Sequence, residues 1–565
     1  MTLQDTQRLI NWYVEIDRTT AAKEPLALLG CPGLNTVATT QVGAVRGFWP
    51  LPGGTQALVA AANTIYLMTI TVAATQNTIP QFGIVALGTI GTNTGPVVMR
   101  DNGVLTAGQG GYVFIVDGST SCYYYRIAGA GTYSFTGGLS TSSPTIALGN
   151  AVPPNALPPG LIVGAAVTLT DTGGLIPAST TISSIDYNTP AIGMSANSTG
   201  TNPSTTITLT IPQFGLITDP GFLGADRIAF IEGWLVFNYP GTRTFYTTGP
   251  VAYSNTFPGS FYALKDSSTD NLITLYENNR ELWLIGERTS EVWYNAGNAN
   301  FAFDRIPGVG PQIGCAAKHS IHRAGSQLVW LGKNEQGENV IIATNQYSWT
   351  RLSTHAVEHA ISGYPLVSDC IGYAYIEEGH LFSVLTFPTA DVTWVYDFAS
   401  ELWHQRASYD PVAGVFHRHK GNAYMDFGDV RIVGDYSNGN IYQMSRQFYT
   451  DAGGVIRAVR RTPHVWSRGN RERLFFSQLQ VEFTPGVGLQ VGQGSNPQVM
   501  LRWSDDGGFT WSNEHWTTIG KAGQTKNRAI WRALGTARDR VWEVTYTDPT
   551  ARDIIGSTLF AEASG

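Results

Sequence analysis

Three pairs of histidines have spacings that could place two ligands on one metal ion. They are His319-x-x-His322, His355-x-x-x-His359 and His417-x-His419. Zinc sites need three or four ligands and a supporting shell of hydrogen bonds, and no further ligand is evident beside any pair. The middle pair reads HAVEH, the inverted form of a zinc-protease motif, which works only on a helix. Because the surrounding sequence is typical of strands, we expect exposed or core-bonded histidines and no metal site.

The densest charged group is a set of six arginines within 17 positions near the C-terminus. Guanidinium groups pair well with carboxylates and with phosphates. We favour ion pairs between subunits of an assembly; a passage that contacts phosphates and a solvated loop are the alternatives. The six candidates are Arg457, Arg460, Arg461, Arg468, Arg471 and Arg473.

The sharpest local motif is Ser504–Trp511, which matches the Asp box, S-x-D-x-G-x-T-W. In this turn an aspartate accepts backbone N–H bonds, a glycine takes a positive φ, and the tryptophan anchors the hairpin in a core. The turn residues are Ser504, Asp506, Gly508, Thr510 and Trp511. Sialidases carry several such boxes with an arginine triad and a Tyr–Glu pair. This chain has one box, outside its repeat region, so we expect a structural turn.

Signatures of nucleotide binding and of serine catalysis are absent from the sequence. It contains neither a G-x-x-x-x-G-K-[ST] phosphate loop nor a G-x-S-x-G nucleophile elbow. Cys31, Cys122, Cys315 and Cys370 form no C-x-x-C pair, so we expect free buried thiols. No secretory signal and no run of 18 apolar residues is visible. We expect no enzymatic activity and no cofactor.

The composition indicates an all-β, turn-rich protein. Only 14% of the 565 residues are charged, against about 25% in typical globular proteins, and the 63 glycines are an enrichment. The 64 aromatic residues (15 Trp, 25 Tyr and 24 Phe) exclude a disordered chain. A net charge of −7 predicts no general affinity for nucleic acids or acidic membranes.

A repeat extends from about residue 50 to residue 450. Each unit is a β-branched or aromatic run, a turn and a second run. The turns lie near residues 233, 279, 337, 379 and 428, with a mean spacing of about 49, and earlier candidates lie at Asn63 and Gly110. A repeat of this length made of antiparallel strands predicts a β-propeller of six or seven blades. Two stacked β-sandwiches are the alternative.

One segment within the repeat region differs from the rest. From residue 128 to 213 only two residues are charged, and Thr, Ser and Gly dominate. Three runs, Val167–Thr170, Thr180–Ile185 and Thr205–Thr210, alternate like half-buried strands. We therefore predict an inserted small β-domain; a flexible linker is the alternative.

After residue 455 the composition becomes more basic, with 14 Lys plus Arg and 10 Asp plus Glu. Strands at Phe475–Phe483, Val499–Trp503 and Arg540–Tyr546 predict a further β-domain. The predicted units are an N-terminal segment (1–48) that contributes to the C-terminal platform, the first blades (49–127), the insert (128–220), the remaining blades (221–454) and the C-terminal platform (455–565).

The C-terminal domain also resembles a known family. The runs that carry the resemblance are Arg460–His464, Phe475–Phe483, Gly492–Val499, Leu501–Gly508 and Arg538–Val544, with Cys31–Leu34 near the N-terminus. They are similar to the packaged-DNA-stabilising tail proteins of short-tailed bacteriophages, also called tail hub or nozzle proteins. The similarity is strong over 455–548, moderate over 25–70 and 220–450, and absent from 128–220.

The resemblance implies a structural virion protein that forms a hexameric ring below the portal and its adaptor. The ring would retain packaged DNA and form the channel for its ejection, without sequence specificity and without membrane insertion. Implied partners are five further copies of the chain, the portal-adaptor protein, needle, plug or fibre proteins, and double-stranded DNA. The location would be the virion tail, after assembly in the host cytoplasm, and the six arginines become candidates for an interface or the DNA channel. The C-terminal domain would be the attachment platform, and the insert would point towards the tail tip.

A different class of function stays open: a glycan-binding or glycan-cleaving tail module that contacts the host surface. Its aromatic platform would be Tyr133, Phe135 and Tyr187 of the insert, where carboxylates are few. A cellular scaffold propeller is the third reading, and the phage-like C-terminus disfavours it.

Overall fold

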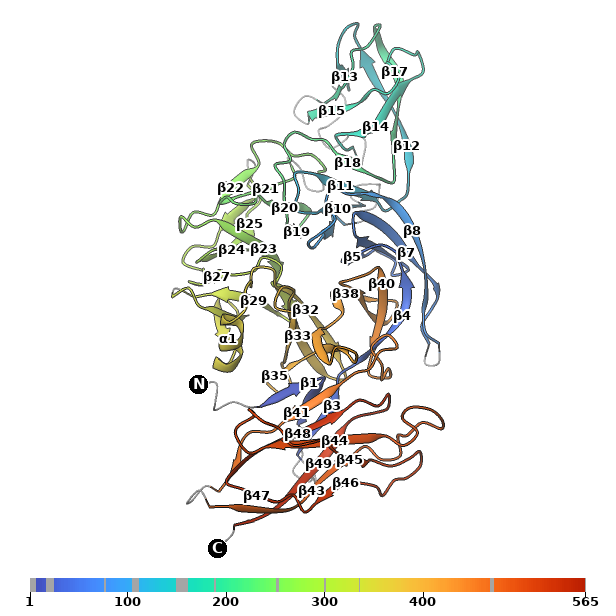
Figure 1. Ribbon diagram of the computed structural model, residues 1–565. Helices are drawn as coiled ribbons and strands as arrows, with labels where there is room; N and C mark the ends of the chain where they lie inside the picture. Colours follow the sequence, from blue (N-terminus) through green and yellow to red (C-terminus); the bar gives the residue numbers. More distant parts are fainter. Residues whose placement is uncertain are drawn as a thin grey trace.

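The structure is a computed structural model of the chain, in which an all-β ring carries one small domain at each of two opposite ends (Figure 1). It describes residues 7–16, 25–75, 78–103, 111–148, 161–186, 190–249, 254–298, 301–334, 336–467 and 472–563.

The ring is a β-propeller, as the repeat predicts, and the described residues form seven blades. Blade one is β5 (Val45–Pro50), β6 (Gln56–Ala61), β7 (Thr64–Val72) and β8 (Gln81–Thr89); blade two is β9 (Val98–Asp101), β10 (Tyr112–Val116), β11 (Cys122–Arg126) and β18 (Phe214–Ile217); blade three is β19 (Ile228–Ile231), β20 (Trp234–Asn238), β21 (Thr244–Thr247) and β22 (Tyr262–Leu264); blade four is β23 (Leu272–Asn278), β24 (Glu281–Gly286), β25 (Ser290–Asn295) and β26 (Phe303–Arg305). Blade five is β28 (His322–Ala324), β29 (Gln327–Lys333), β30 (Asn339–Asn345) and β31 (Ser348–Arg351), with β27 (Gly314–Cys315) also on β29; blade six is β32 (Ile371–Glu377), β33 (His380–Phe387), β34 (Val392–Asp397) and β35 (Leu402–Gln405); blade seven is β38 (Gly421–Phe427), β39 (Val430–Asp435), β40 (Asn440–Ser445) and β4 (Gly33–Thr39).

The second strands of the blades are buried along nearly their whole length. In β6, β10, β24 and β29 almost every residue is buried, because a neighbouring blade covers each face of the strand. Strands covered on both faces need continuous apolar runs instead of alternation. This is why these runs were visible in the sequence as blocks of Val, Ile, Leu and Trp.

Four of the predicted turns are two-residue hairpin loops. In Glu232–Gly233, Asn279–Arg280, Glu378–Gly379 and Gly428–Asp429 both residues have a positive φ. This is the geometry of a type I′ turn, whose twist matches that of the flanking strands. The turn near residue 337 joins β29 to β30, and the candidate turn at Gly110 lies outside the described residues.

An N-terminal strand closes the ring. β4 is the outer strand of blade seven and pairs with β40, so the two ends of the propeller sequence share one sheet. Gly33 begins β4, and a Cβ atom there would lie 2.3 Å from the Phe448 carbonyl oxygen and 2.6 Å from that of Thr450. Only glycine permits this close approach of two backbone segments. A separate hairpin, β36 (Ala407–Asp410) and β37 (Val415–Arg418), connects blades six and seven.

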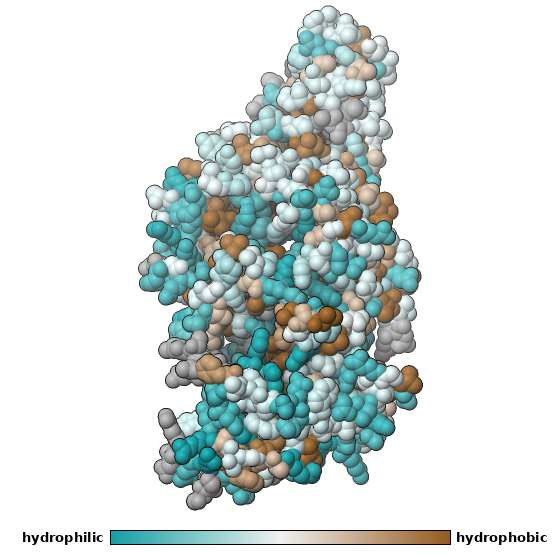
Figure 2. Space-filling model, in the orientation of Figure 1, coloured by the Kyte–Doolittle hydropathy of each residue, from teal (hydrophilic) through white to brown (hydrophobic). Residues whose placement is uncertain are grey.

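Blade two is interrupted by the insert. After β11 the chain leaves the blade and returns as β18, which lies inside the predicted 128–220 unit. Between them six strands pair in a closed barrel, and the face of it seen in Figure 2 is mostly pale, of intermediate hydropathy. Its buried Ile, Leu and Met side chains join one core with Phe114 and Tyr124 of the blade, so the insert is a packed domain. The strands are β12 (Gly131–Leu139), β13 (Thr145–Ala147), β14 (Gly164–Asp171), β15 (Thr181–Asp186), β16 (Ala191–Met194) and β17 (Asn202–Ile211).

The C-terminal domain is a sandwich of two sheets. The first is β1 (Arg8–Ile10), β41 (Ala458–Arg461), β48 (Asp539–Tyr546), β44 (Gln498–Ser504) and β45 (His515–Thr518); the second is β2 (Trp12–Ile16), β3 (Leu26–Gly30), β49 (Ile554–Ala563), β43 (Leu474–Phe483) and β46 (Ala529–Arg532). Short strands β42 (Val465–Trp466) and β47 (Thr536–Ala537) pair with β48 and β43. β1 also pairs in parallel with β35 of blade six, so propeller and sandwich share a continuous sheet.

A single α-helix occurs in the described residues: α1 (His355–Ser362), between blades five and six. The Thr354 side chain caps its first turn by accepting a hydrogen bond from the Val357 N–H, and Gly363 ends it. Val357 and Ile361 face the core. No described helix is long and apolar enough to cross a bilayer.

Candidate interaction sites

A row of charged side chains crosses four strands of the first sandwich sheet. Arg8 of β1 lies opposite Arg461 of β41, Arg461 opposite Glu543 of β48, and Glu543 opposite Arg502 of β44. The neighbouring β48 residues Trp542 and Val544 belong to the sandwich core, so the row lies on the outer face of the sheet. Three guanidinium groups and one carboxylate give this face an excess of positive charge.

Glu543 is the centre of the row. It is 2% exposed, and it accepts hydrogen bonds from Arg461 Nη2 at 2.7 Å and from Arg502 Nε at 2.6 Å, one on each carboxylate oxygen. Burial, and then the nearby Arg461 charge, lower the pKa of Arg8. The row therefore holds one buried anion between cations, and Arg8 adds further positive charge to it.

The remaining candidate arginines have different surroundings. Arg457 Nη1 donates to the Tyr409 hydroxyl at 2.8 Å, and its guanidinium lies over the Tyr409 ring. Arg460, on β41, donates to the Gln7 side chain at 3.3 Å. Arg473 is exposed just before β43. Arg468 and Arg471 lie outside the described residues.

The Asp-box segment forms a tight turn after β44. Asp506 accepts the backbone N–H groups of Phe509 and Thr510 at 3.0 and 2.9 Å, and the Thr510 hydroxyl at 2.6 Å. The Ser504 hydroxyl also donates to Asp506 and accepts the Gly508 N–H at 2.8 Å. These hydrogen bonds, led by that of Ser504, hold the pKa of the Asp506 carboxyl well below its usual range.

Trp511 has a different position from the one the motif suggests. Its indole N–H donates to the Gly508 carbonyl at 3.0 Å, and its ring lies over two guanidinium groups, 4.6 Å from Arg461 and 4.8 Å from Arg502. It is half-buried on the outer face of the sheet, whereas Trp542 fills the core on the inner face. Trp511 thus covers the arginine row by cation–π contacts.

Two clusters join the propeller to the sandwich. His380, at the start of β33, bonds through Nδ1 to the buried Asp397 at 2.8 Å and through Nε2 to Glu15 of β2 at 2.5 Å. Burial lowers the pKa of His380, but the hydrogen bonds to Glu15 and Asp397 outweigh it and the net pKa is raised. Arg446, which follows β40, bonds to Asp553 beside β49 at 3.0 Å. The relative position of the two domains is therefore held by ionic groups as well as by the shared sheet.

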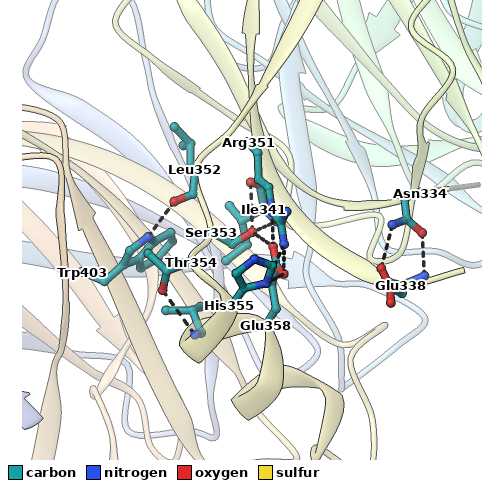
Figure 3. A network of polar contacts seen from close by, with 11 residues as sticks. Asn334, Glu338, Ile341, Arg351, Leu352, Ser353, Thr354, His355, Glu358 and Trp403 are labelled. Carbon is teal, nitrogen blue, oxygen red and sulfur yellow. Dashed lines mark hydrogen bonds and ion pairs between the residues drawn. The ribbon is translucent and has the colours of Figure 1, made fainter. Parts of the chain in front are cut away.

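The HAVEH run lies on a helix, and the expectation of a strand there is wrong. Its Thr354 cap and the Gly363 end outweigh the strand-rich surroundings. Glu358 accepts hydrogen bonds from Arg351 and, at 2.5 Å, from the Ser353 hydroxyl (Figure 3). His355 lies beside this pair, and His355 and His359 are both exposed.

In each of the other two histidine pairs, the two histidines have different surroundings. His322 is buried and His319 is half-buried, and desolvation lowers the pKa of both, to about 4 for His322. His417 bonds to Asp391 at 2.7 Å, while His419 is buried with a lowered pKa. Across the described residues no three His, Cys, Asp or Glu side chains are placed to hold a metal ion. The four cysteines are free and buried, and burial raises the pKa of Cys31 to about 11.

Two family models match the chain, one for each of its larger domains. Residues 169–449 match the model described as bacteriophage P22 Gp10, beta-propeller, and residues 457–559 match bacteriophage P22 Gp10, beta-sandwich. The chain belongs to the bacteriophage P22 Gp10 family. The resemblance to phage tail hub proteins is thereby confirmed, and with it a phage tail structural protein of all-β fold. The matched segment begins inside the insert, so the expectation that the similarity is absent from all of 128–220 is wrong for residues 169–220. Blade one and the first three strands of blade two precede the matched segment.

Solved structures show only distant similarity. The N-terminal domain of Nup159 is 8% identical (TM-score 0.34; 78% of this chain and 99% of that chain covered), and the Dos1 propeller is 8% identical (TM-score 0.32; 73% and 95%). PorZ of Porphyromonas gingivalis is 8% identical (TM-score 0.34; 87% and 48%). Scores at this level carry no functional argument. No curated protein matches the sequence.

Arg8, Arg502 and Glu543 were not among the sequence candidates. They lie far from the arginine group in the sequence, and only the register of β1, β41, β48 and β44 brings them beside Arg461. No local signal could have found the row. The Asp box, by contrast, is a local motif, and its hydrogen bonds are formed within one turn.

Proposed function

We propose that this Gp10-family chain is the subunit of a hexameric hub, or nozzle, below the portal-adaptor assembly of a virion tail. It retains packaged DNA and forms the channel through which DNA leaves, without reading its sequence. The observation that supports this most is that a propeller and a sandwich, joined by one continuous sheet, match the two domains of one phage tail protein. The role is structural and not catalytic.

The sandwich has the surface of an assembly platform. On the outer face of its second sheet, Phe475 and Phe560 remain 45% and 48% exposed on neighbouring strands β43 and β49. Large aromatic side chains are enriched at protein interfaces and are rarely left exposed together. A cyclic ring requires two different complementary faces on each subunit, and we assign this aromatic face and the arginine row to the contacts with neighbouring subunits or with the adaptor.

The six arginines stay candidates for these contacts or for the channel wall. Arg461 and Arg457 already bind Glu543 and Tyr409 within the chain, so we assign them to holding the sandwich face in shape. Arg460 lies on β41 and Arg473 is exposed just before β43, and we expect these two positions to meet a partner or DNA. The insert, which extends from the opposite end of the ring, is the part we assign to the distal side of the tail (Figure 1).

The test is a virion made without this chain, by a nonsense codon in its gene, and imaged by electron microscopy. The proposal predicts that particles without the chain lose their packaged DNA, so that most heads are empty. Particles to which the purified chain is added during assembly should keep their DNA. Heads that stay full of DNA without the chain would refute the retention role. Replacement of both Arg460 and Arg473 by glutamate should reduce the rescue, whereas the same change at exposed Arg280, in the propeller, should not.

A further inference from the structure

A polar cleft opens between blades four and five. It has a volume of about 530 Å³, within the range of roughly 300–1,000 Å³ that small-ligand sites occupy. Three turns surround it: β23–β24, β28–β29 and β30–β31. The lining consists of amides, hydroxyls, two aromatic rings and one carboxylate. The lining residues are Asn278, Asn279, Glu281, Trp283, Ser326, Gln327, Thr344, Asn345, Gln346 and Tyr347.

Two polar groups in the cleft wall are buried without a hydrogen-bond partner. Asn278 is 5% exposed; its Nδ2 donates weakly to the Ser326 carbonyl at 3.4 Å, and its Oδ1 has no partner among the described residues. Trp283 is 1% exposed, and its indole N–H likewise lacks a partner in the described part of the chain. A buried polar group left unpaired is destabilising. One acceptor and one donor without a partner thus belong to residues that line the same cleft.

The aromatic wall of the cleft is formed by two stacked rings. Tyr347 is 42% exposed and lies over Trp283, with 6.5 Å between ring centroids and 24° between planes. The Tyr347 hydroxyl donates to Glu281 at 2.5 Å, and this bond raises the pKa of Tyr347. Glu281 is the only charged side chain of the described lining, and it is already engaged. The cleft therefore offers a supported ring face and no free charge.

We propose that this cleft binds a neutral oligosaccharide. Each sugar hydroxyl both donates and accepts, as do the side-chain amides of Asn279, Gln327, Asn345 and Gln346 around the cleft. The C–H face of a sugar ring packs on an aromatic ring such as that of Tyr347. An acidic ligand would meet Glu281, and an apolar ligand would leave the amides unpaired. A neutral, hydroxyl-rich ligand matches every part of the lining.

The cleft shares a face of the propeller with the insert. In a four-stranded antiparallel blade, the first turn and the third turn lie at the same edge. The cleft is built from first turns of blades four and five and the third turn of blade five, and the insert replaces the third turn of blade two. The inference concerns a second activity on that face and does not rest on the hub role, which has its own test.

The experiment is saturation-transfer NMR on the full-length chain with maltotriose, cellotriose, mannotriose and chitotriose as probes. We expect transfer to at least one of the four. Tyr347→Ala should weaken that binding at least about tenfold, as expected for the loss of a ring contact of about 1.4 kcal/mol. Tyr347→Phe, which keeps the ring, should bind within about threefold of the wild type, a difference below 1 kcal/mol.

Matched variants test whether the loss of binding is specific to the cleft. Tyr262, 53% exposed on β22 of blade three, lies outside the cleft, and Tyr262→Ala should bind as the wild type does. Asn345→Ala changes an exposed side chain at the end of β30, so weakened binding there supports the site even if Tyr347→Ala folds poorly. Absence of transfer to all four sugars at millimolar concentration would overturn the proposal. So would equal weakening by Tyr262→Ala, or another polypeptide occupying the cleft in an imaged tail.

Discussion

A single substitution at Glu543 is expected to destabilise the first sheet of the sandwich. Glu543→Gln keeps the size of the side chain and removes the only anion of the arginine row. Two guanidinium groups bind this carboxylate by charge-assisted hydrogen bonds, Arg461 through Nε and Nη2 and Arg502 through Nε. Counted as one bond for each guanidinium, they contribute about 1.5–3 kcal/mol apiece. Because Arg461 and Arg502 are 20% and 30% exposed, water compensates part of the loss, and the lower end of the range applies. We expect a loss of about 3 kcal/mol in the local stability of the first sandwich sheet.

The assay is hydrogen exchange of the β44 and β48 backbone amides, followed by mass spectrometry. A loss of about 3 kcal/mol corresponds to an exchange rate about a hundredfold faster where exchange follows opening of the sheet. The control is Glu514→Gln, which alters a half-exposed carboxylate 3.9 Å from Arg457 and should change exchange by less than about threefold. If Glu543→Gln leaves exchange within the range of the control, the row does not stabilise the sheet and the reasoning fails.

Three further predictions concern the joint, the ring closure and the Asp box. The pKa of His380 is raised in the folded chain, so the contribution of this histidine to stability is complete below its unfolded pKa, about 6.5, and is lost as pH rises through the folded pKa. His380→Gln should therefore lower the urea midpoint of unfolding more at pH 6 than at pH 9. An equal loss at both pH values would contradict the assignment. Gly33→Ala should destabilise the propeller by about 1–3 kcal/mol, because the new methyl group meets two backbone oxygens; thermal unfolding would show this against Gly259→Ala, which meets no atom within 4 Å and should be neutral. Asp506→Ala should speed hydrogen exchange at the amides of Phe509 and Thr510, and unchanged exchange there would mean that the carboxylate does not hold the turn.

The propeller could be predicted from sequence because its signals are local. Two-residue turns need residues that accept a positive φ, such as Asn279 and Gly379. The continuous apolar runs that flank these turns indicate strands buried on both faces. The insert within the propeller was predicted, but the ring closure through β4 and the return of the chain to blade two as β18 could not be. Both depend on pairing between segments far apart in the chain, β4 with β40 and β11 with β18, and nothing near Gly33 or Phe214 in the sequence encodes the partner.

The candidate site was predictable to a smaller extent. The arginine group was visible as a cluster of charge, but the partners of Arg461 are set by strand register. The helix at His355 was missed because its signal, a threonine cap and a terminal glycine around eight residues, is weak beside the strand patterns that flank it. Trp511 was assigned to a core by its motif. The core already holds Trp542, so Trp511 packs instead on guanidinium groups outside it.

The measurement that tests the central claim most directly is electron microscopy of the native particle, with this chain labelled and its copies counted. The account predicts six copies in a ring immediately below the portal-adaptor, with the sandwich towards the head, the insert on the distal side and the central passage open to DNA. A peripheral fibre position, or a copy number that is not six per tail, would contradict it.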